Sequence, residues 1–247
     1  MKVIPLSEGS FTIDKTKLFV PFREGTDELQ KRSAGSLLVE VQPFVVITSE
    51  DVLLLDTGLG FTNEQDVLQL HDNLMKAGIN PSEITKVLLS HLHKDHAGGA
   101  GIENKTTGEV KPAFPQATYY VQKKELEFAF EKGFPSFVTE ELKCLKNNPQ
   151  VELLDGNGVI NGYIRYEVTA AHSPYHQVFT IVDAGEIIFF GADDAPQLHQ
   201  MKTRFVAKYD YDGKKCMELR RQWWEKGHQE HWRFLFYHDI KTPEYKE

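Results

Sequence analysis

Runs of apolar and polar residues divide the first half of the chain into predicted strands and helices. Residues 37–48 are mostly apolar and β-branched and predict a strand, and residues 52–56 predict a second strand that pairs with it as a hairpin. Apolar positions at helical spacing predict a helix between residues 62 and 78. A short strand over residues 86–90 follows, and the order strand, helix, strand is typical of an α/β protein.

The second half continues this mixed pattern. Residues 97–115 are rich in Gly, Pro and Thr and predict a long loop. We expect strands at residues 117–121, 151–154, 163–169, 178–182, 187–190 and 234–237, and helices at residues 123–131, 138–146 and 214–226. No repeat or change in composition marks a boundary, so we expect a single domain over residues 1–247.

Composition and charge exclude several classes of protein. The 247 residues include 28 Lys and Arg and 36 Asp and Glu, a formal net charge of −8, which argues against a general nucleic-acid binder. The only cysteines, Cys144 and Cys216, exclude a disulfide scaffold or cysteine zinc finger and are expected to be reduced, packed thiols. No apolar run is long enough for a membrane helix. Residues 1–10 lack the apolar core of a signal peptide, so we expect a cytoplasmic protein.

Histidine carries the candidate chemistry. Residues 91–96 read His-Leu-His-Lys-Asp-His, which places three imidazoles and one carboxylate within six positions. Imidazole is the commonest metal-binding side chain at neutral pH, and the cluster directly follows a predicted strand, where α/β proteins place their chemistry. The segment therefore predicts a metal site, and its four donors are enough to face two ions.

This hexapeptide resembles the signature of the metallo-β-lactamase superfamily, His-x-His-x-Asp-His after a short strand. Further motifs of that family follow in the same order from about Val39 to Asp239. They are Leu55-Asp56-Thr57-Gly58, Gly98-Gly99, Ala171-His172-Ser173-Pro174, Gly191-Ala192-Asp193-Asp194 and Phe236-Tyr237-His238-Asp239.

The resemblance implies an α/β fold built as a four-layer αβ/βα sandwich, with the site at one edge of the sheets. It also implies two divalent metal ions, with zinc expected. One ion would be held by His91, His93 and His172, the other by Asp95, His96 and His238, and Asp193 would bridge them. Nitrogen and oxygen ligands suit catalytic zinc. No motif contains cysteine, which separates the chain from members that use a cysteine ligand.

Several site residues keep two interpretations. Ala192 separates the glycine from the aspartates, so either Asp193 or Asp194 could bridge; we favour Asp193, which fits an Asp-x-x-Pro pattern ending at Pro196. Asp56 is expected to orient a ligating histidine or simply to end a strand. His176 could contact substrate or be structural. The remaining histidines, expected to be surface or packing residues, are His71, His199, His228 and His231.

The implied activity is hydrolysis of a small ester or lactone by a metal-bridging hydroxide, which Asp95 would aim. The chain looks most like the branch of N-acyl homoserine lactonases and phosphotriester hydrolases, whose members often form dimers, so a homodimer is one alternative. Pro196 stands where those lactonases carry a substrate-contacting tyrosine, which keeps thioester and phosphotriester substrates open. Phe19 and Phe22 would wall the substrate or belong to the core.

The competing class is a redox protein of the same fold, a sulfur dioxygenase with one iron. It would not need His96 and His238 as ligands, and His93 is not the glutamate of the diiron redox branch. A tRNA-processing nuclease is disfavoured by the acidic charge. We expect a small-molecule substrate, and neither a nucleic-acid nor a membrane partner.

Overall fold

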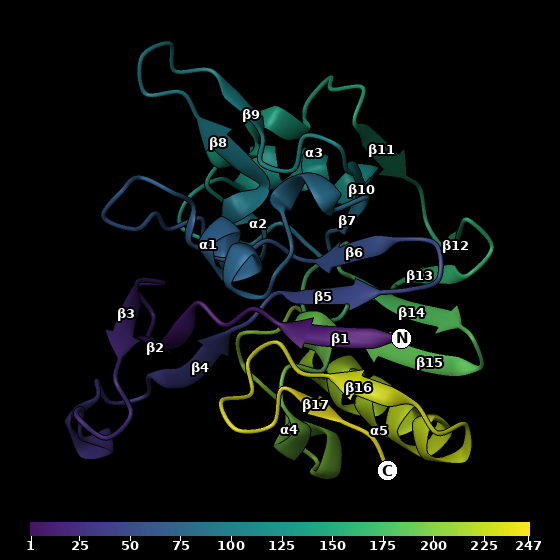
Figure 1. The fold of residues 1–247 in the computed structure, drawn as a ribbon. Helices are drawn as coiled ribbons and strands as arrows, with labels where there is room; N and C mark the ends of the chain where they lie inside the picture. Colours follow the sequence, from purple (N-terminus) through teal and green to yellow (C-terminus); the bar gives the residue numbers. More distant parts are fainter.

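Two six-stranded sheets face each other in the computed structural model, which describes residues 1–247 (Figure 1). The first sheet has the order β1 (Lys2–Pro5), β5 (Phe44–Ile47), β6 (Val52–Leu55), β7 (Lys86–Leu88), β10 (Thr118–Gln122) and β11 (Val151–Leu154). The second has the order β12 (Gly158–Ile160), β13 (Ile164–Val168), β14 (Gln177–Asp183), β15 (Glu186–Phe190), β16 (Arg233–Leu235) and β17 (Glu244–Tyr245).

Helices cover the outer face of each sheet. On the side of the first sheet lie α1 (Gln69–Lys76), α2 (Lys94–Ala97) and α3 (Lys123–Lys132), and on the side of the second lie α4 (Leu198–Lys202) and α5 (Gly213–Gln229) (Figure 1). One apolar core joins α1 and α3 to the first sheet, a second fills the space between the sheets, and a third joins α5 to the second sheet.

The side chains of a single strand enter different cores. On β6, Leu54 packs toward the helices, whereas Leu53 and Leu55 pack between the sheets. On β15, Phe189 contacts Trp223 of α5 and the next residue, Phe190, faces the other sheet. Side chains alternate across a strand with a period of two, so strands apolar on both faces are buried on both sides. The result is the predicted four-layer sandwich.

Two small sheets are added to this frame. A three-stranded sheet contains β2 (Gly9–Ile13), β3 (Phe19–Phe22) and β4 (Leu37–Val41), and it extends to one side of the sandwich (Figure 1). A hairpin is formed by β8 (Gly101–Glu103) and β9 (Val110–Pro112). Among the helices, none combines the length and the apolar character needed to cross a membrane.

Four predicted elements differ in detail. Residues 37–48 form two strands in different sheets, because the chain breaks at Gln42-Pro43 and proline has no N–H for a ladder. The predicted loop 97–115 contains the β8–β9 hairpin, and residues 138–146 contain only a 3-10 turn, Glu141–Leu145. The helix predicted from residue 62 begins at Gln69. Before it, the Asn63 side chain accepts hydrogen bonds from two backbone N–H groups and stabilises a turn instead.

Candidate metal centre

The histidine cluster begins where β7 ends and continues into α2, and the loop after β6 packs directly against it. The N–H of Thr57 donates to the carbonyl of His96 at 2.6 Å, and the N–H of Gly98 donates to the carbonyl of Gly58 at 2.9 Å. A Cβ at Gly60, which has φ +73°, would lie 2.4 Å from the carbonyl oxygen of Gly98. This close approach of two backbones requires glycine.

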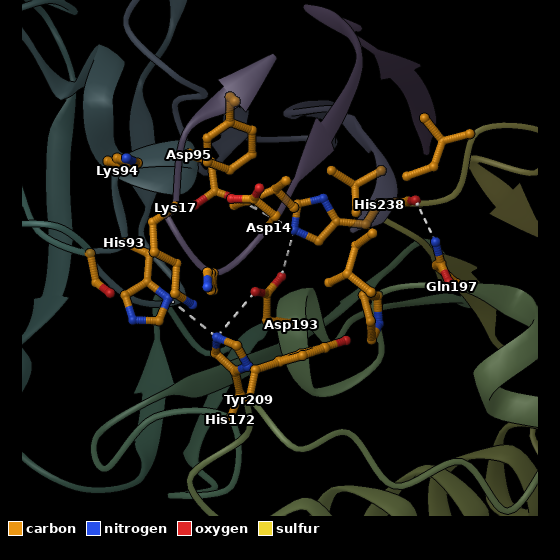
Figure 2. Close-up of a pocket in the computed structure, with 18 of the residues that line it drawn as sticks. Asp14, Lys17, His93, Lys94, Asp95, His172, Asp193, Gln197, Tyr209 and His238 are labelled. Atoms are coloured by element: carbon orange, nitrogen blue, oxygen red, sulfur yellow. Dashed lines mark hydrogen bonds and ion pairs between the residues drawn. The ribbon is translucent and has the colours of Figure 1, made fainter. Parts of the chain in front are cut away.

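Three imidazoles from two segments form the first group of donors. Nε2 of His91 lies 3.0 Å from Nδ1 of His93, and Nε2 of His172 lies 3.2 Å from the same atom. His172 comes from the loop between β13 and β14, so the second sheet supplies it. Figure 2 shows His93 and His172 pointing toward each other.

The second group joins the carboxylate of Asp95 to two further imidazoles. Oδ2 of Asp95 lies 3.6 Å from Nε2 of His96 and 3.5 Å from Nε2 of His238. His238 follows β16 at the C-terminal end of the second sheet. The edge shared by the two sheets therefore assembles donors from distant parts of the chain.

Asp193 lies between the two groups. Its Oδ2 is 3.1 Å from Nε2 of His172, and its Oδ1 is 3.0 Å from Nε2 of both His96 and His238 (Figure 2). Each carboxylate oxygen thus faces a different group, and the structure brings all seven predicted residues together in two clusters that could each hold an ion.

Asp194 faces away from these donors. Its Oδ1 accepts the backbone N–H of His172 at 2.7 Å, its Oδ2 lies 3.0 Å from Nδ1 of His176, and its carbonyl accepts a hydrogen bond from Arg220. The preceding Ala192 has φ +42°, in the left-handed region that L residues rarely adopt. Of the two aspartates that the sequence left open, Asp193 faces the site.

Four of the ring nitrogens that face away from the donor groups are held by hydrogen-bonding partners. Asp56 contacts Nδ1 of His96 at 2.8 Å while accepting the N–H and hydroxyl of Ser90. Asp210 contacts Nδ1 of His172 at 2.8 Å. The other two contacts join Ser90 Oγ to His91 Nδ1 and the Glu40 carbonyl to His238 Nδ1. Such partners fix the tautomer and orientation of a ligating imidazole.

Asp210 is a functional candidate that sequence reasoning missed. It lies in the segment between α4 and α5, which carries no motif, and its only local signal is a carboxylate in the stretch Tyr209-Asp210-Tyr211-Asp212. Its contact with His172 joins positions 38 residues apart, and the N–H of Tyr211 also donates to the His172 carbonyl at 3.0 Å. Asp56, in contrast, contacts a proposed ligand histidine, which agrees with one of the two roles expected from the sequence.

The charged groups of the site shift each other's pKa values. Burial, together with neighbouring imidazoles, lowers the pKa of His91 and His93 well below the usual value, so both are neutral and able to donate a lone pair at neutral pH. Burial alone would raise the pKa of Asp193, but the imidazoles of His96, His238 and His172 outweigh it and hold that pKa well below the usual value. Asp193 is therefore ionised.

The donor set fits metal ions. Nε2 of His96 and Oδ1 of Asp193 are buried and lie 3.0 Å apart, but neither makes a hydrogen bond of good geometry, although buried polar atoms are nearly always paired. Imidazole nitrogen and carboxylate oxygen are ligands for zinc and related divalent ions. Cations between these groups would satisfy the unpaired atoms.

A cavity of about 710 Å³ opens above the centre. Asp193, His172 and His238 lie on its floor, and apolar wall residues include Phe19, Leu38 and Phe205. Phe19 therefore reaches the cavity, whereas Phe22 does not line it. Pro196 lines the cavity, and so does Tyr209, which comes from another segment of the chain.

The other singled-out residues have structural surroundings. His176 is buried, lies behind His91 with ring centroids 4.9 Å apart, and pairs with Asp194, so it lies outside the cavity lining. His71 packs on Phe114, His228 packs on Trp224, and His199 and His231 are exposed, His199 at the cavity rim. Cys144 and Cys216 are buried free thiols, as predicted.

Comparisons with known proteins identify the family. The family model described as the metallo-beta-lactamase superfamily matches residues 39–221. The chain therefore belongs to this superfamily, and the resemblance seen in its motifs is confirmed.

Individual relatives are similar over parts of their length. An N-acyl homoserine lactonase of Bacillus cereus is 27% identical over 168 residues, which are 60% of this chain and 60% of the relative. N-acyl homoserine lactonase AttM of Agrobacterium fabrum is 30% identical over 119 residues, 44% of this chain and 40% of the relative. The matches thus span less than two thirds of either relative.

Solved structures share the fold over nearly the whole chain. A probable metal-dependent hydrolase from Staphylococcus aureus has a TM-score of 0.77 and 19% identity, covering 99% of this chain and 91% of that chain. AidC, a dizinc quorum-quenching lactonase, has a TM-score of 0.72 and 20% identity, covering 98% of this chain and 88% of that chain. These relatives and neighbours are hydrolases, which supports the predicted class of enzyme.

Proposed function

We propose that the chain is a dinuclear metal-dependent hydrolase of a small ester or lactone. The position of Asp193 carries the proposal, because its two oxygens face two separate groups of donors at 3.0 to 3.1 Å. A site for a single ion would not need the second group. The proposed ligands are His91, His93 and His172 for one ion, Asp95, His96 and His238 for the other, and Asp193 for both.

Two divalent ions, with zinc expected, would lower the pKa of a bound water and polarise the oxygen of a substrate carbonyl. The chain supplies positioning. The hydroxyl of Tyr237 donates to the backbone carbonyl of Asp95 at 2.5 Å, and its ring stacks on His96 with centroids 4.1 Å apart. Asp95 is thereby fixed at the cavity floor, where its carboxylate can aim a water and carry a proton to the leaving group.

Tyr209 supports substrate binding from the cavity wall. Partial burial and the charges of Asp210 and Asp193 raise its pKa above the usual value. The phenol therefore keeps its proton and can donate a hydrogen bond to a substrate oxygen. It comes from a different segment than Pro196, the position at which related lactonases place their tyrosine.

The lactonase relatives and the apolar wall of the cavity support a lactone or ester with an apolar portion. Metal analysis of protein purified without added metal, followed by a substrate panel, tests the proposal. We expect about two divalent ions per chain and hydrolysis of lactones or aryl esters, with one labelled oxygen entering the acid product from heavy-oxygen water.

Three outcomes would contradict this proposal. A single iron per chain would indicate the redox alternative, and turnover of thioesters or phosphotriesters alone would change the substrate class. Undiminished activity after chelation has removed the metal would exclude a metal-dependent reaction.

Asp95→Asn should lower kcat steeply, because it removes the carboxylate that would aim the water. His231→Asn, which changes an exposed histidine outside the site, is the control and should leave kcat unchanged.

A further inference from the structure

Two lysines lie at the cavity without a counter-ion. Lys17 and Lys94 both line it and are both half-buried. Neither ammonium has a carboxylate oxygen within 4.0 Å or donates a hydrogen bond, whereas the ammonium of buried Lys86 pairs with Asp51 at 2.5 Å. Most of the other unpaired lysines are exposed to solvent, so two half-buried, unpaired cations beside one cavity call for an explanation.

Both lysines are held in place by the fold. Lys17 lies at the tip of the β2–β3 hairpin, where its N–H donates to the carbonyl of Asp14 at 3.0 Å. Its neighbours Lys15 and Leu18 are exposed, whereas Lys17 turns inward. Lys94 starts α2, between ligands His93 and Asp95, and its ammonium lies 5.8 Å from the ring centre of Phe19. Figure 2 shows Lys17 and Lys94 on the side of the cavity that carries His93.

The charges near these lysines do not neutralise them. Lys17 is close enough to His93 and Lys94 for its charge to lower the pKa of both, after the larger effect of burial. The carboxylates whose charge reaches Lys94, those of Asp95 and Glu141, lie beyond ion-pair distance. Under the proposed function, Asp95 and Asp193 are already offset by the divalent ions they hold, so the lysine charges stay available.

We propose that Lys17 and Lys94 form an anion subsite beside the metal centre, and that the substrate is an ester or lactone carrying a carboxylate. The metal centre would take the bond to be cleaved, and the lysines would take the carboxylate on the His93 side. An ammonium–carboxylate contact in a partly desolvated cavity gives binding energy and fixes orientation. This inference rests on the proposed function for the reaction, but the subsite itself is measurable by binding.

Equilibrium binding tests the subsite without turnover. Calorimetry on the zinc-loaded protein compares the dicarboxylates succinate, glutarate and adipate with the matched monocarboxylates propionate, butyrate and valerate. We expect at least one dicarboxylate to bind about tenfold or more tightly than its partner, with a preference that falls as salt is added. Lys17→Met should remove most of that preference and Lys17→Arg should retain it.

Lys31→Met is the matched control, because Lys31 is exposed, pairs with Glu28 and lies outside the cavity. It should keep the wild-type preference. Zinc content and circular dichroism establish that Lys17→Met is folded and binds zinc. Lys94→Met removes the other lysine charge and tests the same subsite independently. Equal binding of dicarboxylates and monocarboxylates, or a preference unchanged in both methionine variants, would overturn the subsite.

Kinetics separate this inference from the proposed function. The ratio of kcat/KM for mono-p-nitrophenyl glutarate to that for p-nitrophenyl butyrate should favour the charged ester and fall about tenfold in Lys17→Met. If neither ester nor any lactone is hydrolysed, the proposed function fails while the calorimetry still decides the subsite. If both esters are hydrolysed with equal efficiency in all variants, the function stands and the subsite fails.

Discussion

Asp193 and Asp194 are neighbours in the chain, but their carboxylates lie in different surroundings. Asp193 lies on the cavity floor, 3.0 Å from His238 Nε2, and Asp194 is enclosed beside His176. Within one turn, Asp193 thus provides a donor to the site, and Asp194 stabilises the loop that carries His172.

Exchanging each of these aspartates for asparagine should separate the two roles. Asp193→Asn should lose metal, because a neutral amide bridges two cations poorly, while the metal-free protein keeps its stability. Asp194→Asn should lower the free energy of unfolding by about 1–3 kcal/mol, since it removes the charged partner of buried His176. Metal content and urea unfolding of both variants measure the difference. If Asp194→Asn lost metal and Asp193→Asn kept it, the bridging ligand would be Asp194.

Removing ligand histidines should abolish the link between metal and stability. His91→Ala, His93→Ala and His172→Ala should each contain less metal than the wild type. Metal that binds only the folded state stabilises it, so a chelator should lower the Tm of the wild type but change that of these variants little. His231→Asn controls for loss of an exposed imidazole. Full metal content in all three variants would show that the site is wrongly assigned.

Asp210→Asn should weaken metal binding without removing a ligand. Its carboxylate holds Nδ1 of His172, and loss of such a partner typically reduces metal affinity about 10–100-fold. Competition with a chromogenic chelator measures the affinity, and Asp155→Asn, at an exposed position, is the control. Equal affinities for the wild type and Asp210→Asn would mean that this contact does not tune the site.

Glu8 should make the metal-free protein less stable as pH rises. Burial raises its pKa to about 7 from an ordinary value of 4.5, even though the Leu59 N–H donates to its carboxylate. Between these values the unfolded chain releases a proton that the folded protein keeps. The stabilisation present below pH 4.5 is therefore lost as pH rises through 7.

Glu8→Gln keeps an acceptor for Leu59 and removes this titration. Relative to the variant, the wild type should lose up to about 3 kcal/mol between pH 4.5 and pH 8. Urea unfolding of the metal-free proteins at pH 5 and pH 8 gives the comparison, and Glu64→Gln controls for the loss of an exposed carboxylate. Parallel pH profiles for wild type and Glu8→Gln would contradict the prediction.

The sequence by itself determined the main donor cluster, and its motifs identified the family whose resemblance implied the four layers. The donor cluster is local: the hexapeptide 91–96 places four donors on one strand end and the turn that follows. The spacing of consecutive residues fixes where such side chains point, so they can be predicted without knowing the rest of the fold.

The tertiary structure decided what depends on contacts between distant segments. The apolar run 37–48 does not show that its two halves enter different sheets, and consecutive aspartates do not show which of them faces His238. Asp210 reaches His172 because the segment before α5 pairs with the loop that carries His172, where the N–H of Tyr211 donates to the His172 carbonyl. Lys17 reaches the cavity from the tip of the β2–β3 hairpin. Each of these contacts joins residues that local propensity places independently, so only the packing of the complete chain determines them.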